Sequence, residues 1–147
     1  MADIIYIFEG KPYFNITNKC PCNCAFCIRE QKDVVGSAKQ MWHNTQPTFE
    51  DVKTAVDALD WSIYNEAVFC GYGEPTERLY DLLEVAKYIK SKYDIKIRIN
   101  TNGLADLIWN EATAPKLQGL IDCVSVSLNA TNKEDYLKVV RPKFGIE

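Results

Sequence analysis

Hydrophobic and polar positions alternate along the chain in short segments, and the period of the alternation changes from that of a strand to that of a helix. Two apolar runs, at residues 4–8 and 13–17, surround a Gly-Lys-Pro turn and predict a hairpin or a pair of strands joined by a turn. Three later runs predict strands at residues 66–71, 96–101 and 122–129.

Helical periods lie between these strands. The capping pattern Thr48-x-x-Asp51 predicts a helix that runs to about residue 64. A second helix is predicted from Thr76 or Glu77, with a leucine-rich buried stripe and lysines towards its C-terminal end. The polar stretch before the first helix, from residue 29 to Pro47, keeps no period and is predicted to be a long loop, which is often a functional element.

The last third of the chain predicts three shorter helices. One covers residues 104–110, and another begins near Pro115. The third opens with a capping box at Thr131 and Glu134 and ends before an Arg-Pro pair. Strand and helix therefore alternate, as in right-handed parallel crossover units, and we expect an α/β fold with a parallel sheet and outer helices in one domain over residues 1–147.

The strand predicted at residues 122–129 has two different faces. Val124, Val126 and Leu128 are apolar, whereas the other face is polar and includes Ser127 and Asn129. A buried parallel strand is normally apolar on both faces, so polar inward side chains indicate a cavity that binds a ligand. A solvated strand face is the alternative interpretation.

Composition narrows the class of protein. The 147 residues are 47% hydrophobic and 25% charged, which is typical of one globular domain. No apolar run approaches the roughly 20 residues of a membrane span, and no basic region precedes the first apolar residues. We therefore expect a cytoplasmic protein without membrane contact. A net charge of −3 gives no general attraction to nucleic acids.

Four of the six cysteines lie in the segment Cys-Pro-Cys-Asn-Cys-Ala-Phe-Cys. Taken as Cys20, Cys24 and Cys27, they bring three thiolates into one loop and leave a four-iron cluster one protein ligand short, so that one iron is open to an outside molecule. The alternative is structural zinc, although zinc modules usually contribute two separated Cys-x2-Cys pairs. A disulfide framework fits less well, because we expect a cytoplasmic chain with a core of its own.

This spacing, with aromatic Phe26 before the last cysteine, resembles the signature of the radical S-adenosylmethionine (SAM) superfamily. The resemblance implies a 4Fe-4S cluster on Cys20, Cys24 and Cys27, whose open iron is chelated by the amino and carboxylate groups of SAM. Cys22 is then the spare cysteine. It further implies that an electron from the cluster cleaves SAM to a 5′-deoxyadenosyl radical, which abstracts hydrogen from a substrate that the sequence does not identify.

The segment Gly-Tyr-Gly-Glu-Pro-Thr that follows the strand at residues 66–71 supplies a glycine turn with a carboxylate, Glu74. In unrelated proteins such a turn is often a plain strand-to-helix connection. Here it resembles the Gly-Gly-Glu-Pro segment of the family, which implies that Gly73 and Glu74 contact the SAM amino group. Tyr72 stands where the family often has glycine.

Two later segments also resemble the family. Asn100-Thr-Asn102-Gly is similar to its Thr-Asn-Gly turn, and a plain turn is the alternative. Ser127 and Asn129 are similar to the polar positions of its fourth strand, which implies contacts with the methionine carboxylate and the ribose.

The resemblance implies a partial (β/α) barrel, and the predicted elements cover about its first four β/α units. Small radical SAM proteins linked to TatD-type nucleases are the most similar members. The segment of the fifth strand that packs on adenine is absent, so we expect a core truncated at its C-terminus that self-associates through its open sheet edge or needs a partner. The resemblance also implies an electron donor such as flavodoxin or ferredoxin.

The remaining candidate residues have simpler interpretations. Cys70 and Cys123 are expected to be buried small apolar groups, and His43 a surface residue. Trp42 is expected to cover the long loop. A non-catalytic iron-sulfur or zinc-binding module that acts through a partner protein is the alternative function.

Overall fold

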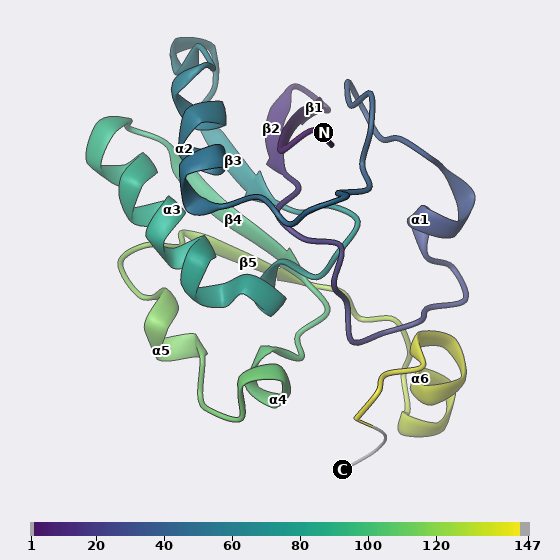
Figure 1. The fold of residues 1–147 in the computed structure, drawn as a ribbon. Coiled ribbons are helices and arrows are strands. Elements are labelled where there is room, and N and C mark those ends of the chain that lie inside the picture. The colour runs from purple at the N-terminus through teal and green to yellow at the C-terminus, as the bar shows by residue number, and fades with distance from the viewer. Residues whose placement is uncertain (1, 145–147) are drawn as a thin grey trace.

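A five-stranded sheet runs through the computed structural model, which describes residues 2–144 (Figure 1). Its strands are β1 (Ile5–Phe8), β2 (Lys11–Phe14), β3 (Glu66–Phe69), β4 (Lys96–Thr101) and β5 (Cys123–Val126). They lie in chain order, with β1 antiparallel to β2 and all other neighbours parallel. The predicted α/β fold is confirmed, and β2 to β5 are the four parallel strands of the expected partial barrel.

The first two strands form the predicted hairpin. Glu9 and Gly10 connect them with φ values of 49° and 76°, and two central residues with positive φ give a turn whose twist matches that of the strands. This tight turn places Lys11 opposite Phe8, so β2 begins inside the predicted turn and ends at Phe14, before the predicted end.

Six helices in the described part of the chain surround the sheet. They are α1 (Ile28–Gln31), α2 (Phe49–Asp57), α3 (Leu79–Lys92), α4 (Ala105–Trp109), α5 (Ala114–Leu117) and α6 (Lys133–Val140). In Figure 1, α2 and α3 lie side by side over the sheet, while α1 and α6 lie beyond the C-terminal ends of the strands. Between residues 2 and 144, no helix combines the length and the apolar character needed to cross a membrane.

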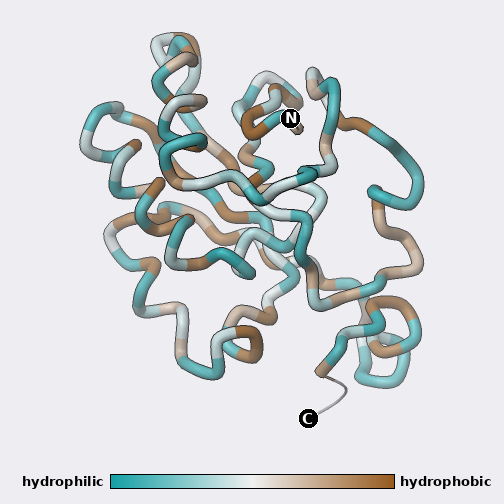
Figure 2. The backbone as a smooth tube through the Cα atoms, in the orientation of Figure 1, coloured by the Kyte–Doolittle hydropathy of each residue, from teal (hydrophilic) through white to brown (hydrophobic). Residues whose placement is uncertain are grey.

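The core lies between the sheet and the pair α2 and α3. One face of the strands contributes fully buried side chains, namely Phe14, Ala67, Phe69, Ile97 and Ile99. The helices contribute Val52, Val56, Leu79, Leu82, Leu83, Ala86 and Ile89. Figure 2 shows these hydrophobic positions along the strands and at intervals on the helices. This core anchors the strands, so that their C-terminal ends form a rigid base for the loops that follow them.

The helices over the core begin and end at positions that differ slightly from those predicted. α2 ends at Asp57 instead of near residue 64, and the Trp61 indole N–H then donates to the Val56 carbonyl at 2.8 Å. α3 begins at Leu79, because residues 75–78 form a tighter 3-10 turn.

The predicted capping box at Thr131 and Glu134 is wrong by one residue. The cap of α6 is Asn132, whose side-chain oxygen accepts from the Asp135 backbone N–H at 2.9 Å. Asparagine is as good an N-cap as threonine, so the local sequence allowed both starts.

β5 is one of the two edge strands, the other being β1, and both faces of β5 are exposed. Val124 is 43% exposed and Val126 57%, although they lie on the same sheet face as the buried Ile99. Helices α4 and α5 are too short to cover this strand. Cys123 lies on the other face of β5, in register with Arg98, and is also exposed, so the prediction that it is buried is wrong.

Candidate functional site

The cysteine loop follows β2 and crosses the C-terminal ends of the strands. Asn15, fully buried at the end of β2, holds the start of this region in place. Its side-chain amide donates to the Met41 carbonyl at 2.8 Å and to the Asp3 carbonyl at 3.2 Å, and its side-chain oxygen accepts from the Tyr72 N–H at 3.2 Å. Three segments that are distant in sequence therefore meet at one asparagine.

The C-terminal end of α6 supports the cysteine loop from the other side. The last turn of a helix leaves its carbonyls without partners inside the helix. Here the Asn23 N–H donates to the Val140 carbonyl at 3.0 Å, and the Ala25 N–H donates to the Val139 carbonyl at 2.8 Å. The Lys143 N–H donates to the Pro21 carbonyl, also at 2.8 Å. The backbone of the loop is thus fixed by a helix more than a hundred residues further along the chain.

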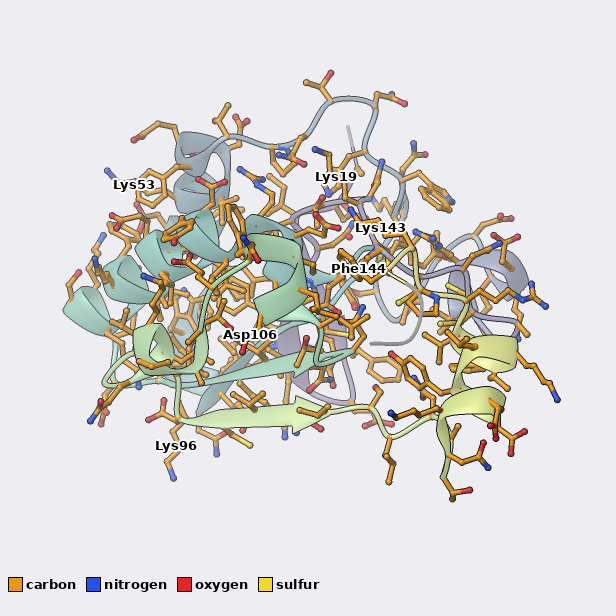
Figure 3. The ribbon with its side chains drawn as sticks, turned by 90° about the horizontal axis from the view of Figure 1, so that it is seen from below. Lys19, Lys53, Lys96, Asp106, Lys143 and Phe144 are labelled. Carbon is orange, nitrogen blue, oxygen red and sulfur yellow. The ribbon has the colours of Figure 1, made fainter. Side chains whose placement is uncertain are left out.

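Figure 3 shows Lys143 and Phe144, which follow α6, near Lys19, which precedes the cysteines. An antiparallel bridge between Cys22 and Pro142 completes this contact. No local sequence signal predicts it, because the helix pattern at residues 133–140 carries no information about its partner.

A cavity of about 310 Å³ lies at the C-terminal edge of the sheet. All ten residues singled out in the sequence as cofactor or metal ligands line it. They are Cys20, Cys24, Phe26, Cys27, Gly73, Glu74, Asn100, Asn102, Ser127 and Asn129. They meet because loops after parallel strands emerge at the same edge of a sheet.

The four clustered cysteines differ in their surroundings. Cys20, Cys24 and Cys27 are partly exposed, whereas Cys22 is 6% exposed and accepts a long hydrogen bond from the Asn102 amide at 3.5 Å. A hydrogen bond from the Cys22 thiol, together with the charge of Arg29, lowers the pKa of Cys20 to about 7. The same thiol contact raises the pKa of Cys22, and burial raises that of Cys24. Cys20 is therefore readily deprotonated, as a metal ligand must be.

Glu74 is the most strongly bonded group of the site. Its carboxylate is 5% exposed. Oε1 accepts from the Thr101 hydroxyl at 2.5 Å and from the Thr76 hydroxyl at 2.7 Å, with a longer bond from the Thr76 N–H at 3.3 Å. Among the described residues, Oε2 accepts from the Asn102 N–H alone, at 2.8 Å. A carboxylate has about four acceptor positions, so Oε2 keeps one for a further donor.

This network joins the glycine turn after β3 to the Asn-Gly turn after β4. Thr101 and Thr76 were not selected from the sequence. The sequence signal that points to them is weak. Thr101 is a hydroxyl residue at the end of a predicted strand, and Thr76 is a hydroxyl residue at the start of a predicted helix, each beside a turn.

Gly73 lies against the backbone before the cysteines. A Cβ atom at this position would be 2.3 Å from the Thr17 carbonyl oxygen and 2.6 Å from the Lys19 carbonyl oxygen. The Lys19 carbonyl also accepts from the Glu74 N–H at 2.7 Å. Only glycine therefore allows the two segments to pack at this distance.

We expect Gly73→Ala to lower the free energy of unfolding by about 1–3 kcal/mol, as overpacking of a tight site does, and to loosen the turn from the cysteine loop. Urea unfolding measures this change. Gly119→Ala is a suitable control, because open space surrounds Gly119 and its φ of 79° alone carries the cost. Equal losses in the two variants would contradict a specific close contact at Gly73.

Tyr72, the departure from the family pattern, is buried beside the cavity. Its ring packs edge-on against Trp42 with centroids 5.1 Å apart, and its hydroxyl donates to the Lys32 carbonyl. The Arg29 guanidinium lies over the Trp42 ring, 5.7 Å from its centroid. Tyr72 thus anchors the long loop, and Trp42 packs over the loop as expected.

His43 is buried at 7% exposure, so the prediction of a surface residue is wrong. Its Nε2 lies 2.6 Å from the Asn15 carbonyl oxygen, and its backbone exchanges two hydrogen bonds with the Asn18 side chain. Burial lowers the pKa of His43, which favours the neutral ring. The histidine joins the loop to the segment before the cysteines.

Cys70 lines the cavity and is only partly buried, in contrast to its predicted burial. Between residues 2 and 144, no three cysteine, histidine or carboxylate side chains come together as ligands of one metal ion. The three candidate cysteines share the wall of the cavity.

Comparison with known families gives one result. The model of the radical SAM superfamily matches residues 14–147. Searches among curated proteins and among solved structures gave no match.

Proposed function

We propose that the chain, which belongs to the radical SAM superfamily, is an enzyme that holds a 4Fe-4S cluster on Cys20, Cys24 and Cys27 and binds SAM in the adjoining cavity. When bound, the cluster supplies the electron that cleaves SAM and so provides a 5′-deoxyadenosyl radical for hydrogen abstraction from a substrate. The observation that carries the proposal is the single cavity lined by the three cysteines, the glycine turn and the ends of β4 and β5.

The residues present fit the cluster. Three thiols line one cavity wall, each with partial exposure, and Cys20 has a pKa of about 7. A structural zinc site usually takes two Cys-x2-Cys pairs from separated segments, and only Cys24 and Cys27 form such a pair in this loop. The spacing of the cysteines therefore favours the cluster over the zinc alternative.

The cavity also fits a small polar ligand. Its volume of about 310 Å³ lies at the lower end of the usual range of roughly 300–1,000 Å³ for ligand sites. We propose that Gly73 and the free position on Glu74 Oε2 hold the SAM amino group. Asn100, Asn102, Ser127 and Asn129 then face the remaining polar groups of SAM, and Phe26 packs beside them.

Anaerobic reconstitution with iron and sulfide, followed by reduction in the presence of SAM, tests this function. The expected result is visible absorption of an iron-sulfur cluster and formation of 5′-deoxyadenosine. A cluster without any cleavage of SAM would favour the non-catalytic iron-sulfur module, and preferential uptake of zinc would favour the zinc-binding module. Absence of both cluster and cleavage would overturn the proposal.

Four further parts of the function rest on chemistry and family likeness. We propose a cytoplasmic location, where thiols stay reduced, and an electron donor of the flavodoxin or ferredoxin type. The reaction would be an oxidoreduction that begins with hydrogen abstraction. The likeness to TatD-linked members stays a prediction, since the matching family model describes the superfamily as a whole.

We also propose that the exposed edge of β5 is an association surface. An uncovered edge strand presents unpaired backbone N–H and C=O groups, and here Val124 and Val126 add apolar surface. A second copy of the chain can pair with this edge. Light scattering should therefore show dimers or larger species that increase with protein concentration.

Val126→Lys should shift the protein towards the monomer, because lysine on an edge strand opposes pairing. Val34→Lys is the matched control, since Val34 is also exposed and lies in the long loop. A parent protein that stays monomeric at tens of micromolar would show that this edge does not drive association.

A further inference from the structure

The two faces of β4 are chemically opposite. Ile97 and Ile99 are buried against the helices. Successive side chains of a strand alternate between its faces, so Arg98 and Asn100 point to the other face. Asn100 lines the cavity, and Arg98 is one step deeper on the same face, about 7 Å away along the strand. The polar face of β4 therefore continues the cavity wall towards the interior of the partial barrel.

Each of these two side chains has a buried polar atom without a hydrogen-bond partner in the described chain: the Nε of Arg98 and the Oδ1 of Asn100. The first is a donor and the second an acceptor. Leaving a buried polar atom without a partner is unfavourable, and each such atom in a native protein calls for an explanation, such as a catalytic role or a bound water, ion or ligand. They form a complementary pair on one wall.

The other contacts of Arg98 are long. Its Nη2 lies 3.7 Å from the Glu66 carboxylate and 3.4 Å from the Tyr13 hydroxyl. Glu66 has a closer partner in Lys11, whose Nζ is 2.9 Å from the same carboxylate oxygen. One carboxylate thus serves two cations, and the charge of Arg98 is only partly balanced.

Other charged side chains lie near Arg98 at the start of the strands. Lys96, two residues before Arg98, points to the same face of β4 and pairs in register with Glu66. Figure 3 shows Lys96 at the start of β4, away from α6. Asp94 lies beside Lys11, Glu66 and Lys96, so the lysines have acidic neighbours there, whereas the one ion pair of Arg98 within the described residues is its long contact with Glu66.

Arg78 shows how the same chain uses an arginine for structure. Its guanidinium donates to the Ile16 carbonyl at 2.9 Å, to the Pro47 carbonyl at 2.6 Å and to Asp81 at 3.0 Å. All three bonds are short and direct. Arg98 makes no contact as short as these within the described residues, so a purely structural function accounts for it poorly.

We infer that Arg98 and Asn100 bind an anionic group of the substrate, a carboxylate or a phosphate that carries a neighbouring hydroxyl or amino group. The oxygens of the anion accept hydrogen bonds from the Arg98 guanidinium, as carboxylates and phosphates commonly do with arginine in proteins. The neighbouring O–H or N–H donates to the Asn100 oxygen. Ser125, which pairs in register with Asn100 on β5, adds a hydroxyl on the same face. The inference rests on the proposed function in one respect, namely that the adjoining cavity holds SAM.

The test uses the full chain without cluster or SAM. The chain has four arginines, so their Nε–H signals are few enough to follow by nitrogen-15 NMR. Glycerol phosphate and lactate are titrated separately at constant ionic strength, and inorganic phosphate serves as the probe without a neighbouring alcohol group. The Arg98 signal is assigned by its loss in Arg98→Lys.

The expected result is a saturable shift of the Arg98 signal with glycerol phosphate or with lactate, and the stronger of the two identifies the anion. Inorganic phosphate should bind more weakly than glycerol phosphate. Binding to the variants, which lack the Arg98 signal, is measured by calorimetry: Arg98→Gln should weaken it at least about tenfold, with Arg98→Lys between the parent and the Gln variant. Arg141→Gln is the control and should bind as the parent does.

A shift at Arg98 no larger than at Arg141, or equal binding by the Gln variant, would overturn the inference. If the Gln variant is unfolded, the affinity of the Lys variant for the anion alone tests the inference, because lysine keeps the positive charge but lacks the Nε–H group. SAM cleavage is measured separately. A protein that cleaves SAM but shows no anion binding refutes only the substrate subsite, and the reverse outcome refutes only the proposed reaction.

Discussion

Alanine at Cys20, Cys24 or Cys27 is expected to abolish assembly of the iron-sulfur cluster, whereas Cys22→Ala is expected to keep it. All four thiols line the cavity, but only the first three are partly exposed. Cys22 is buried, and burial together with its contact with Cys20 raises its pKa, which disfavours the thiolate that a metal ligand must be. Loss of one of three ligands leaves the cluster open to solvent and unstable.

Visible absorption and iron and sulfide content after anaerobic reconstitution measure this effect. Cys123→Ala is the matched control, because Cys123 is exposed on β5 and far from the loop in the sheet order. Melting temperatures of the metal-free variants show whether the fold survives. Loss of the cluster in Cys22→Ala together with its retention in Cys20→Ala would reverse the assignment.

Glu74→Gln is expected to weaken SAM binding by roughly tenfold to a hundredfold, the size of a lost charge-assisted hydrogen bond of about 1.5–3 kcal/mol. The neutral amide cannot attract the SAM ammonium group. It also places an N–H₂ donor against a backbone donor, because Oε1 accepts from the Thr76 N–H and Oε2 from the Asn102 N–H. The turn after β3 and the turn after β4 should therefore separate.

Equilibrium binding of SAM to the reconstituted protein measures the loss, and cluster absorption checks that the cysteine loop is intact. Glu77→Gln is the control, since Glu77 lies in the same 3-10 turn and is only partly buried. Thr101→Val separates the effect of the charge of Glu74 from the effect of its positioning. It removes one donor to the carboxylate and keeps the charge, so a loss of affinity in this variant comes from positioning alone. Equal affinity in Glu74→Gln and the parent would remove Glu74 from the SAM site.

The local pattern of the chain was sufficient for the elements of the fold. The strand at residues 96–101 was predicted with its observed bounds, because alternating apolar residues between turn signals depend only on the chain itself. The hairpin and the order of strands and helices follow from equally local signals. The ends of α2 and α6 differ by a few residues, since several nearby side chains can cap or stop a helix equally well.

The sequence also determined the candidates for the site, through the cysteine spacing and the turns that end the parallel strands. It could not determine how these residues are supported. Burial of His43, exposure of Cys123 and the hold of α6 on residues 21–25 all depend on contacts between segments far apart in the chain. Such contacts depend on the order of strands in the sheet and on which edge stays uncovered. No local pattern of hydrophobic and polar residues indicates either of these.

The same distinction applies to charge. The sequence does not show whether the hydrogen bonds of a glutamate in a glycine turn, or of an arginine in a strand, are satisfied. Only the folded sheet places Glu74 among three donor residues and leaves the Nε of Arg98 without a partner in the described chain. The free energy of a buried polar group depends on the partners that surround it, and tertiary packing alone supplies them.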